Sequence, residues 1–128
     1  MEIVWFNERP KEFVVTLTSA NITLNKAATT RFEHAYSVML GTDPVQKLLI
    51  IKPLSKVEAV SKVIPENRKY RITVRSSYSR ISNKGFMKEI SDMTGLDLEN
   101  HTHKFPARWD KNQDLLIVDL KGEVKSND

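Results

Sequence analysis

The side chains best suited to chemistry are lysines and arginines that gather in the middle of this 128-residue chain. Residues 52–88 hold ten basic and two acidic side chains, a net charge of +8, whereas residues 1–51 balance and residues 89–128 carry −4. Clustered cations bind polyanions because they release counterions from phosphates. The segment therefore predicts a nucleic-acid-binding surface, with a solvated sheet face as the alternative interpretation.

Period-two alternation in residues 70–75 predicts a strand within this basic segment. The apolar side chains of that strand then share one face, and Arg71 and Arg75 share the other. On charge alone, Arg71, Arg75 and Lys88 are candidates for contacts with phosphates. An edge strand protected from aggregation by outward charges would account for Arg71 and Arg75 equally well.

Two histidines, His101 and His103, flank Thr102 at a spacing that puts both rings on one side of an extended segment. A closed metal site needs further ligands nearby, so we expect a solvated loop pair and no bound metal. The chain has no cysteine, and its four glycines are too widely spaced for a phosphate-binding loop. The familiar catalytic signatures are lacking, so we expect a protein that is not an enzyme and needs no cofactor.

Aromatic side chains offer a second way to bind nucleic acid. Tyr70 and Tyr78 lie in the basic segment, where exposed rings could stack on bases. Trp5, Phe6 and Trp109 are expected instead to pack in the core or between structural units.

Hydrophobic periodicity and turn residues divide the chain into short elements. Strands are expected at 13–17, 22–24, 36–40, 48–51, 70–75, 104–110 and 115–120, and helices at 26–33, 55–64 and between Ser82 and Gly95. Residues 122–128 are expected to form a flexible tail. The longest aliphatic run, 48–51, is too short to cross a bilayer, and the opening residues lack the pattern of a signal peptide. We therefore expect a cytoplasmic protein without a membrane partner.

The order of these elements repeats along the chain. A β-α-β-β series occupies residues 13–54 and recurs at 70–121, after a linking helix and loop at 55–69. Both helices open with Asn-Lys and a small residue, and both series close with Leu-Leu-Ile and a further aliphatic residue. We expect one strand-rich α+β domain, residues 1–128, in which the two units pack as a pseudo-dimer. Open strand edges would favour a true homodimer as well.

The second unit carries several short motifs in a fixed order. Arg80-Ile81 precedes a helix that carries Lys84 and Ile90 and ends at Gly95-Leu96, and residues 115–118 form the closing strand. In these features the chain resembles the AbrB-like swapped-hairpin DNA-binding family, and its tandem layout resembles that of the MraZ proteins. Ser79 stands where the family usually has glycine, and the first unit has no counterpart of Arg80. The resemblance implies that Arg80 and Lys84 contact DNA from a β-rich face.

Charge and resemblance together predict a small non-enzymatic DNA-binding protein, a transcriptional regulator whose partner is double-stranded DNA. The predicted contact residues are Arg71, Arg75, Arg80, Lys84 and Lys88. The alternative is a protein–protein interaction module or complex subunit that binds no nucleic acid and uses a strand edge or the aromatic arm. A small enzyme of unrecognised type is the third interpretation.

Overall fold

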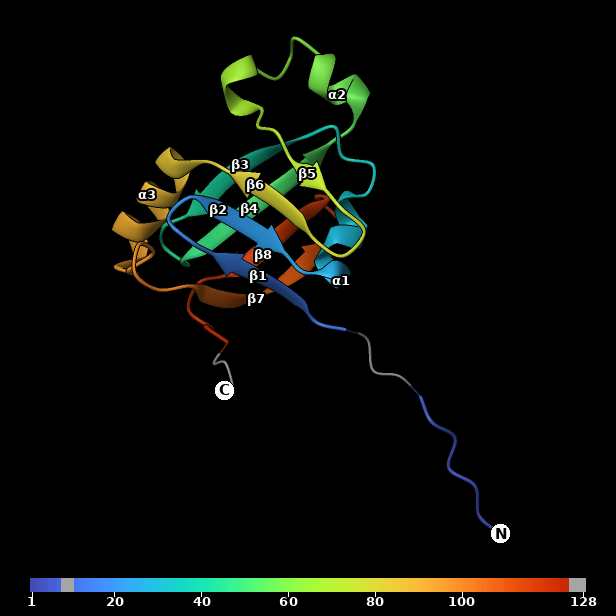
Figure 1. Ribbon diagram of the computed structural model, residues 1–128. Helices are drawn as coiled ribbons and strands as arrows, with labels where there is room; N and C mark the ends of the chain where they lie inside the picture. The colour runs from blue at the N-terminus through green and yellow to red at the C-terminus, as the bar shows by residue number, and fades with distance from the viewer. Residues whose placement is uncertain (8–10, 125–128) are drawn as a thin grey trace.

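Within residues 1–7 and 11–124, which the computed structural model describes, eight short strands form one curled antiparallel sheet with few helices (Figure 1). The fold is therefore α+β and rich in strands. The strands are β1 (Phe13–Leu17), β2 (Asn21–Leu24), β3 (Ser37–Asp43), β4 (Leu48–Leu54), β5 (Thr73–Val74), β6 (Ser79–Ser82), β7 (His103–Asp110) and β8 (Leu115–Asp119). The helices are α1 (Lys26–Thr29), α2 (Lys56–Val60) and α3 (Lys84–Thr94), with 3-10 turns η1 (Thr30–Phe32) and η2 (Glu66–Arg68).

The sheet has the strand order β3-β4-β8-β7-β1-β2-β6-β5, and its two outermost strands approach each other. The Val38 N–H in β3 donates to the Tyr70 carbonyl over 2.9 Å, and the Tyr70 N–H donates back to the Val38 carbonyl over 2.8 Å. Tyr70 lies just before β5, so the sheet curls until β3 contacts the segment that leads into β5. This contact covers part of the β3 edge.

The inward side of the curled sheet forms the hydrophobic core. Alternate residues of β1, β2 and β6 point inward, because side chains in a strand alternate between the two faces. The largest fully buried side chains are Leu17, Ile22, Leu24, Phe32, Leu49, Ile51, Leu54, Ile81, Met87, Ile90, Phe105 and Leu116. Of these, Met87 and Ile90 come from α3, so the helix contributes to the same core as the strands.

The β3–β4 and β7–β8 hairpins close with the same turn. In each, an aspartate, Asp43 or Asp110, accepts hydrogen bonds from the backbone N–H groups two and three residues later. Its second carboxylate oxygen accepts from the side-chain amide of the glutamine three residues later. Lys47 and Asp114, which precede the returning strands, adopt left-handed φ angles of 58° and 53°. In both hairpins the aspartate is paired across the strands with the residue five positions later, so the two hairpins have the same turn length and the same strand register.

Polar caps fix the starts of the helices. Asn25 and Asn83 each accept a hydrogen bond of 3.0 Å from the N–H three residues later, at the starts of α1 and α3. Ser55 and Glu58 form a reciprocal capping box at α2, and the Ser55 backbone N–H that donates to Glu58 lowers the pKa of this carboxyl. Gly95 ends α3 at a left-handed φ of 76°, a conformation that favours glycine.

Several expectations are corrected by these contacts. Ser79–Ser82 form the strand β6, which was not expected, and each unit is therefore β-β-α-β-β instead of β-α-β-β. The strand expected at 70–75 is confined to Thr73–Val74, because Tyr70 pairs with β3 and Arg75 already belongs to the turn before β6. β3 and β4 extend beyond 36–40 and 48–51, because the Asp43 turn begins only at the end of β3. α2 ends at Val60 instead of near Ile64, and the helix expected at 26–33 divides into α1 and η1.

The first residues of the expected tail, 122–124, lie against β7. The Val124 N–H donates to the Lys104 carbonyl over 2.7 Å, and the Glu123 carboxylate contacts Nδ1 of His103. The remainder of that expected tail, 125–128, lies outside the described residues. Within the described ranges, no helix has the length and apolar character needed to cross a membrane.

Candidate nucleic-acid interface

A polar row crosses the outer face of five adjacent strands. Strand pairing sets Lys104 opposite Thr16, Thr16 opposite Thr23, Thr23 opposite Arg80, and Arg80 opposite Thr73. The residues on either side of these positions in β1, β2 and β6 are buried, so the row points away from the core. Hydroxyl and cationic side chains both donate to phosphate oxygens, which suits such a row to a nucleic-acid backbone.

Arg80 lies in this row, and two neighbours hold its exposed guanidinium. Nε donates to Thr23 Oγ1 over 3.3 Å, and the central guanidinium carbon lies 5.2 Å from the centre of the Tyr78 ring. A cation stacked on an aromatic ring and hydrogen-bonded beside it occupies fewer rotamers than a free arginine. Less conformational entropy is therefore lost when Arg80 binds an anion. One face of Tyr78 is covered by this contact, which leaves less of the ring for stacking on bases.

The other two predicted arginines flank the short edge strand β5. The β5–β6 hairpin closes where the Arg75 N–H donates to the Tyr78 carbonyl over 2.8 Å. Arg71 and Arg75 are both exposed. Because β5 stands last in the strand order, protection of a sheet edge and contact with an anion are both compatible with their position.

Lys84 and Lys88 lie beyond the opposite end of β6, on the first turns of α3. Lys84 follows the Asn83 cap directly, and both lysines are exposed. The Lys88 Nζ lies 3.8 Å from Asp92 Oδ2, but these side chains are 80% and 71% exposed, so water and salt weaken the pair. A hollow of about 370 Å³ beside them is lined also by Ser19, Met87, Ser91, Leu98 and Glu99.

The five predicted residues, together a basic stripe, thus lie at both ends of β5, in β6 and on the first turns of α3. At about 3.3 Å per residue, the path from Tyr78 to Lys84 spans roughly 20 Å. Duplex DNA carries one negative charge per ~1.7 Å of its axis, so a duplex laid along this length would present several phosphates to it. Residues 67–88 contain neither Asp nor Glu, and two acidic side chains beside the stripe, Asp92 and Glu99, lie near Lys88. No protein-family model, curated protein or solved structure matches this chain.

The sequence analysis did not identify three residues of this face, which are Lys104, Thr16 and Thr23. Lys104 lies outside the basic segment and joins the row only because β7 pairs with β1 and β1 pairs with β2. Period-two patterning does identify Thr16 and Thr23 as outward, since each lies between buried aliphatic residues. It does not identify which strands are neighbours, so the row could not be assembled.

The histidine pair has surroundings different from those expected. His103 begins β7 with a side chain that is only 15% exposed, so a solvated loop position is wrong for this residue. Its Nδ1 contacts the Glu123 carboxylate, and its Nε2 lies 3.0 Å from the Asp97 carbonyl oxygen. Burial opposes protonation, but these two acceptors outweigh it and raise the pKa of His103 above its ordinary value. The described residues contain no cluster of three or more side chains placed to ligate a metal.

The large aromatic side chains divide into two groups. Trp109 packs as expected: its ring meets Phe32 edge to face at 6.2 Å, and the Arg31 guanidinium lies 5.4 Å from its centre. Trp5 and Phe6 are 78% and 87% exposed, so core packing is wrong for both. An unpacked Trp-Phe pair is unusual on a protein surface.

Proposed function

We propose that this protein is a small DNA-binding protein, a regulator of transcription without an enzymatic activity, that holds double-stranded DNA against the outer face of β1, β2, β5 and β6. The observation that carries the proposal is the position of Arg80, preorganised in a row of hydroxyl and cationic side chains within a segment, residues 67–88, that contains no acidic residue. Phosphate contacts supply most of the affinity in such an interface. A DNA partner and a chain without cysteine favour a cytoplasmic protein.

Each contact residue has a distinct role in this proposal. The Arg80 guanidinium donates two hydrogen bonds, either to two phosphate oxygens or to the O6 and N7 acceptors of a guanine. Thr16 and Thr23 donate hydroxyl hydrogen bonds beside it. Lys84 and Lys88 act as point charges on the DNA backbone at the helix end of the stripe.

We also propose that the chain is an internal duplication whose halves pack as a pseudo-dimer, as the AbrB-like resemblance implies. Residues 13–54 and 70–121 each contain a hairpin, a helix and a second hairpin. If each strand of the first half is matched with its counterpart in the second (β1 with β5, β2 with β6, β3 with β7 and β4 with β8), every pair of neighbouring strands matches another pair of neighbours in the sheet. The counterpart of the β1–β7 pair is the Val38–Tyr70 contact between β3 and the segment before β5. The shared aspartate turns and asparagine caps support the same duplication.

The two halves differ in charge on this face. The Thr18 N–H donates to the Asn21 carbonyl in the β1–β2 turn, just as Arg75 donates to Tyr78, so Thr18 is the counterpart of Arg75. The β-face arginines therefore belong to the second half only. One copy of the chain accordingly contacts a single DNA segment that has no internal two-fold symmetry.

Fluorescence anisotropy with a labelled mixed-sequence duplex at 50 and 200 mM salt tests the proposal. If all five basic residues neutralise a phosphate, log K falls with log salt at a slope of about −4.5, which is roughly 500-fold over this range. A variant with Arg71, Arg75, Arg80 and Lys84 changed to Ala, shown to be folded by circular dichroism, should lose this binding. Absence of binding by the native protein at 50 mM salt would refute the proposal.

A protein–protein interaction module remains the second candidate function, and one observation favours it. Residues Ile3, Val4, Trp5 and Phe6 are consecutive, apolar and exposed. A contact made by this segment would be insensitive to nucleic acid, which distinguishes it from the first proposal.

A further inference from the structure

The N-terminal arm, residues 1–7, lies apart from the sheet and the helices (Figure 1). Its apolar side chains have almost no protein contact: Ile3 is 56% exposed, Val4 91%, Trp5 78% and Phe6 87%. Single exposed apolar residues are common on proteins, but four in succession that include Trp and Phe are typical of a binding segment. Trp and Tyr also dominate the energetics of protein interfaces.

A groove suited to an aromatic side chain lies at the opposite end of the molecule, between β3 and the excursion formed by residues 55–71. It has a volume of about 300 Å³ and is lined by Tyr36, Ser37, Ala59, Glu66, Lys69, Tyr70 and Arg71. This volume is at the lower end of the range for sites that enclose small ligands. Three of the seven lining residues, Tyr36, Ala59 and Tyr70, are aromatic or apolar, so a ring with one polar atom fits beside the two tyrosines.

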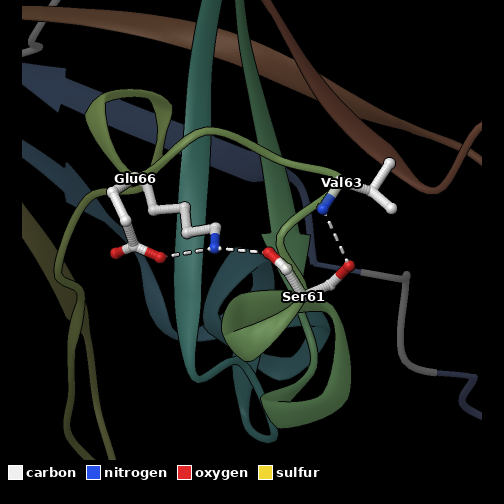
Figure 2. Close-up of polar contacts among 4 residues, drawn as sticks. Ser61, Val63 and Glu66 are labelled. Atoms are coloured by element: carbon white, nitrogen blue, oxygen red, sulfur yellow. Dashed lines mark hydrogen bonds and ion pairs between the residues drawn. The ribbon is translucent and has the colours of Figure 1, made fainter.

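The wall of this groove is held in place by Lys69. Its Nζ donates to the Ser61 carbonyl over 2.9 Å and pairs with Glu66 at 2.7 Å, while the Val63 N–H donates to Ser61 Oγ (Figure 2). The Lys69 side chain is only 6% exposed. These contacts tie residues 61, 66 and 69 of the excursion together, while Val63 between them is 90% exposed.

Ser37 in this groove has an unsatisfied hydroxyl. The residue is 8% exposed, and Ser37 Oγ is buried without a hydrogen-bond partner among the described residues. Buried hydroxyls are hydrogen-bonded in most proteins, because leaving one unpaired is costly. Ser37 also lines the groove, so rotation about its Cα–Cβ bond would present the unpaired hydroxyl to an incoming donor.

We propose that the arm of a second copy of this chain occupies the groove, with Trp5 inserted beside Ser37 and Phe6 packed against the excursion. The indole of Trp is apolar except for one N–H that only donates, which matches the rings of Tyr36 and Tyr70 and the one unpaired hydroxyl of Ser37. Val57, Val60 and Val63 are 78%, 64% and 90% exposed on the excursion, and they offer the remaining apolar surface to Val4 and Phe6.

Charge complementarity favours the arm of a second copy as the occupant of the groove. The arm, residues 1–7, contains one charged side chain, the acidic Glu2, whereas residues 55–71 contain five basic and two acidic side chains. Glu2 adjoins the apolar run of the arm, and Lys62 and Arg68 are exposed on the excursion. Opposite charges around an apolar contact favour the correct pairing of arm and groove. Each chain supplies one arm and one groove, so reciprocal insertion gives a closed dimer.

Sedimentation equilibrium tests the proposal without DNA, so its outcome is independent of the proposed function. The native chain should dimerise in a concentration-dependent way, and the Trp5→Ala/Phe6→Ala variant should raise the dimer Kd by more than about tenfold. Tyr36→Glu, at a groove residue that is 58% exposed, should do the same. Val45→Ser is the matched control, because Val45 is 91% exposed in the β3–β4 turn and should leave the Kd unchanged.

Mixing the two variants separates arm exchange from other modes of association. The Tyr36→Glu copy has an intact arm and the Trp5→Ala/Phe6→Ala copy has an intact groove, so an equimolar mixture should form a heterodimer although each variant alone is monomeric. In a Trp109→Phe background, Trp5 emission should shift to the blue as the dimer forms. A native chain that stays monomeric, a dimer that survives loss of Trp5 and Phe6, a dimer insensitive to Tyr36→Glu, or a blue shift independent of concentration would each overturn the proposal.

Discussion

Replacing Arg80 by Ala removes the central cation of the basic face while leaving the fold intact. Arg80 is exposed, and its contacts with Thr23 and Tyr78 are a surface hydrogen bond and a surface cation–π pair. Such contacts contribute about 1 kcal/mol or less to folding. The variant should therefore remain folded, and a change in DNA binding would report the loss of a contact.

The size of that change follows from counterion release. One neutralised phosphate contributes a factor that scales as salt concentration to the power of about −0.9. Relative to 1 M salt, one such contact increases the affinity roughly eightfold at 0.1 M salt and roughly fourfold at 0.2 M salt. Arg80→Ala should therefore weaken binding by about these factors, and the salt slope should become shallower by ~0.9.

Anisotropy titrations of the native and variant proteins over a series of salt concentrations measure both quantities. Lys111→Ala is the matched control, because Lys111 is an exposed cation in the β7–β8 turn, outside the stripe. It removes the same charge and should leave the slope unchanged. Equal effects of the two substitutions would show that net charge alone governs binding and would refute a localised face.

Three further predictions concern the structure that supports the interface. Asn83→Ala should lower the free energy of unfolding by about 1 kcal/mol, measured by urea denaturation, because α3 loses its N-cap; Asn83→Asp should preserve it. Asp43→Ala and Asp110→Ala should lower Tm by similar amounts, because each loses the same turn hydrogen bonds, and a large inequality would contradict equivalent hairpins. The raised pKa of His103 means that its protonation stabilises the folded state; this stability is complete below the unfolded pKa of about 6.5 and is lost as pH rises through the folded pKa. Glu123→Gln should flatten this part of the unfolding profile between pH 5 and 8, and an unchanged profile would contradict the pairing.

Local features of the fold could be predicted because they depend on a few adjacent residues. The alternation at 13–17 corresponds to β1, and Asn83 and Gly95 delimit α3 through side-chain capping and a left-handed φ. The α+β class follows from the same short periodic segments. The predicted strand boundaries were wrong where a tertiary contact sets the boundary. Tyr70, for example, is not part of the expected strand 70–75 because it pairs with β3.

Neighbour relations between distant strands could not be predicted. Lys104 joins Arg80 across β1 and β2, and no local pattern encodes that order. The exposure of Trp5 and Phe6 was missed for a related reason. Aromatic character alone predicts burial, and only the three-dimensional structure shows that no other part of the described chain packs on the arm. The unpaired Ser37 hydroxyl likewise depends on how the excursion lies over β3.

The central claim is that DNA binds to the outer face of β1, β2, β5 and β6, and an NMR titration tests it most directly. Backbone amide spectra of the 14.7 kDa protein would be recorded while a short duplex is added at low salt. The account predicts that shifts concentrate at Thr16, Thr23, Arg75, Arg80 and Lys84. Shifts confined to β4, β8 and the β7–β8 turn, with residues 71–88 unaffected, would contradict it.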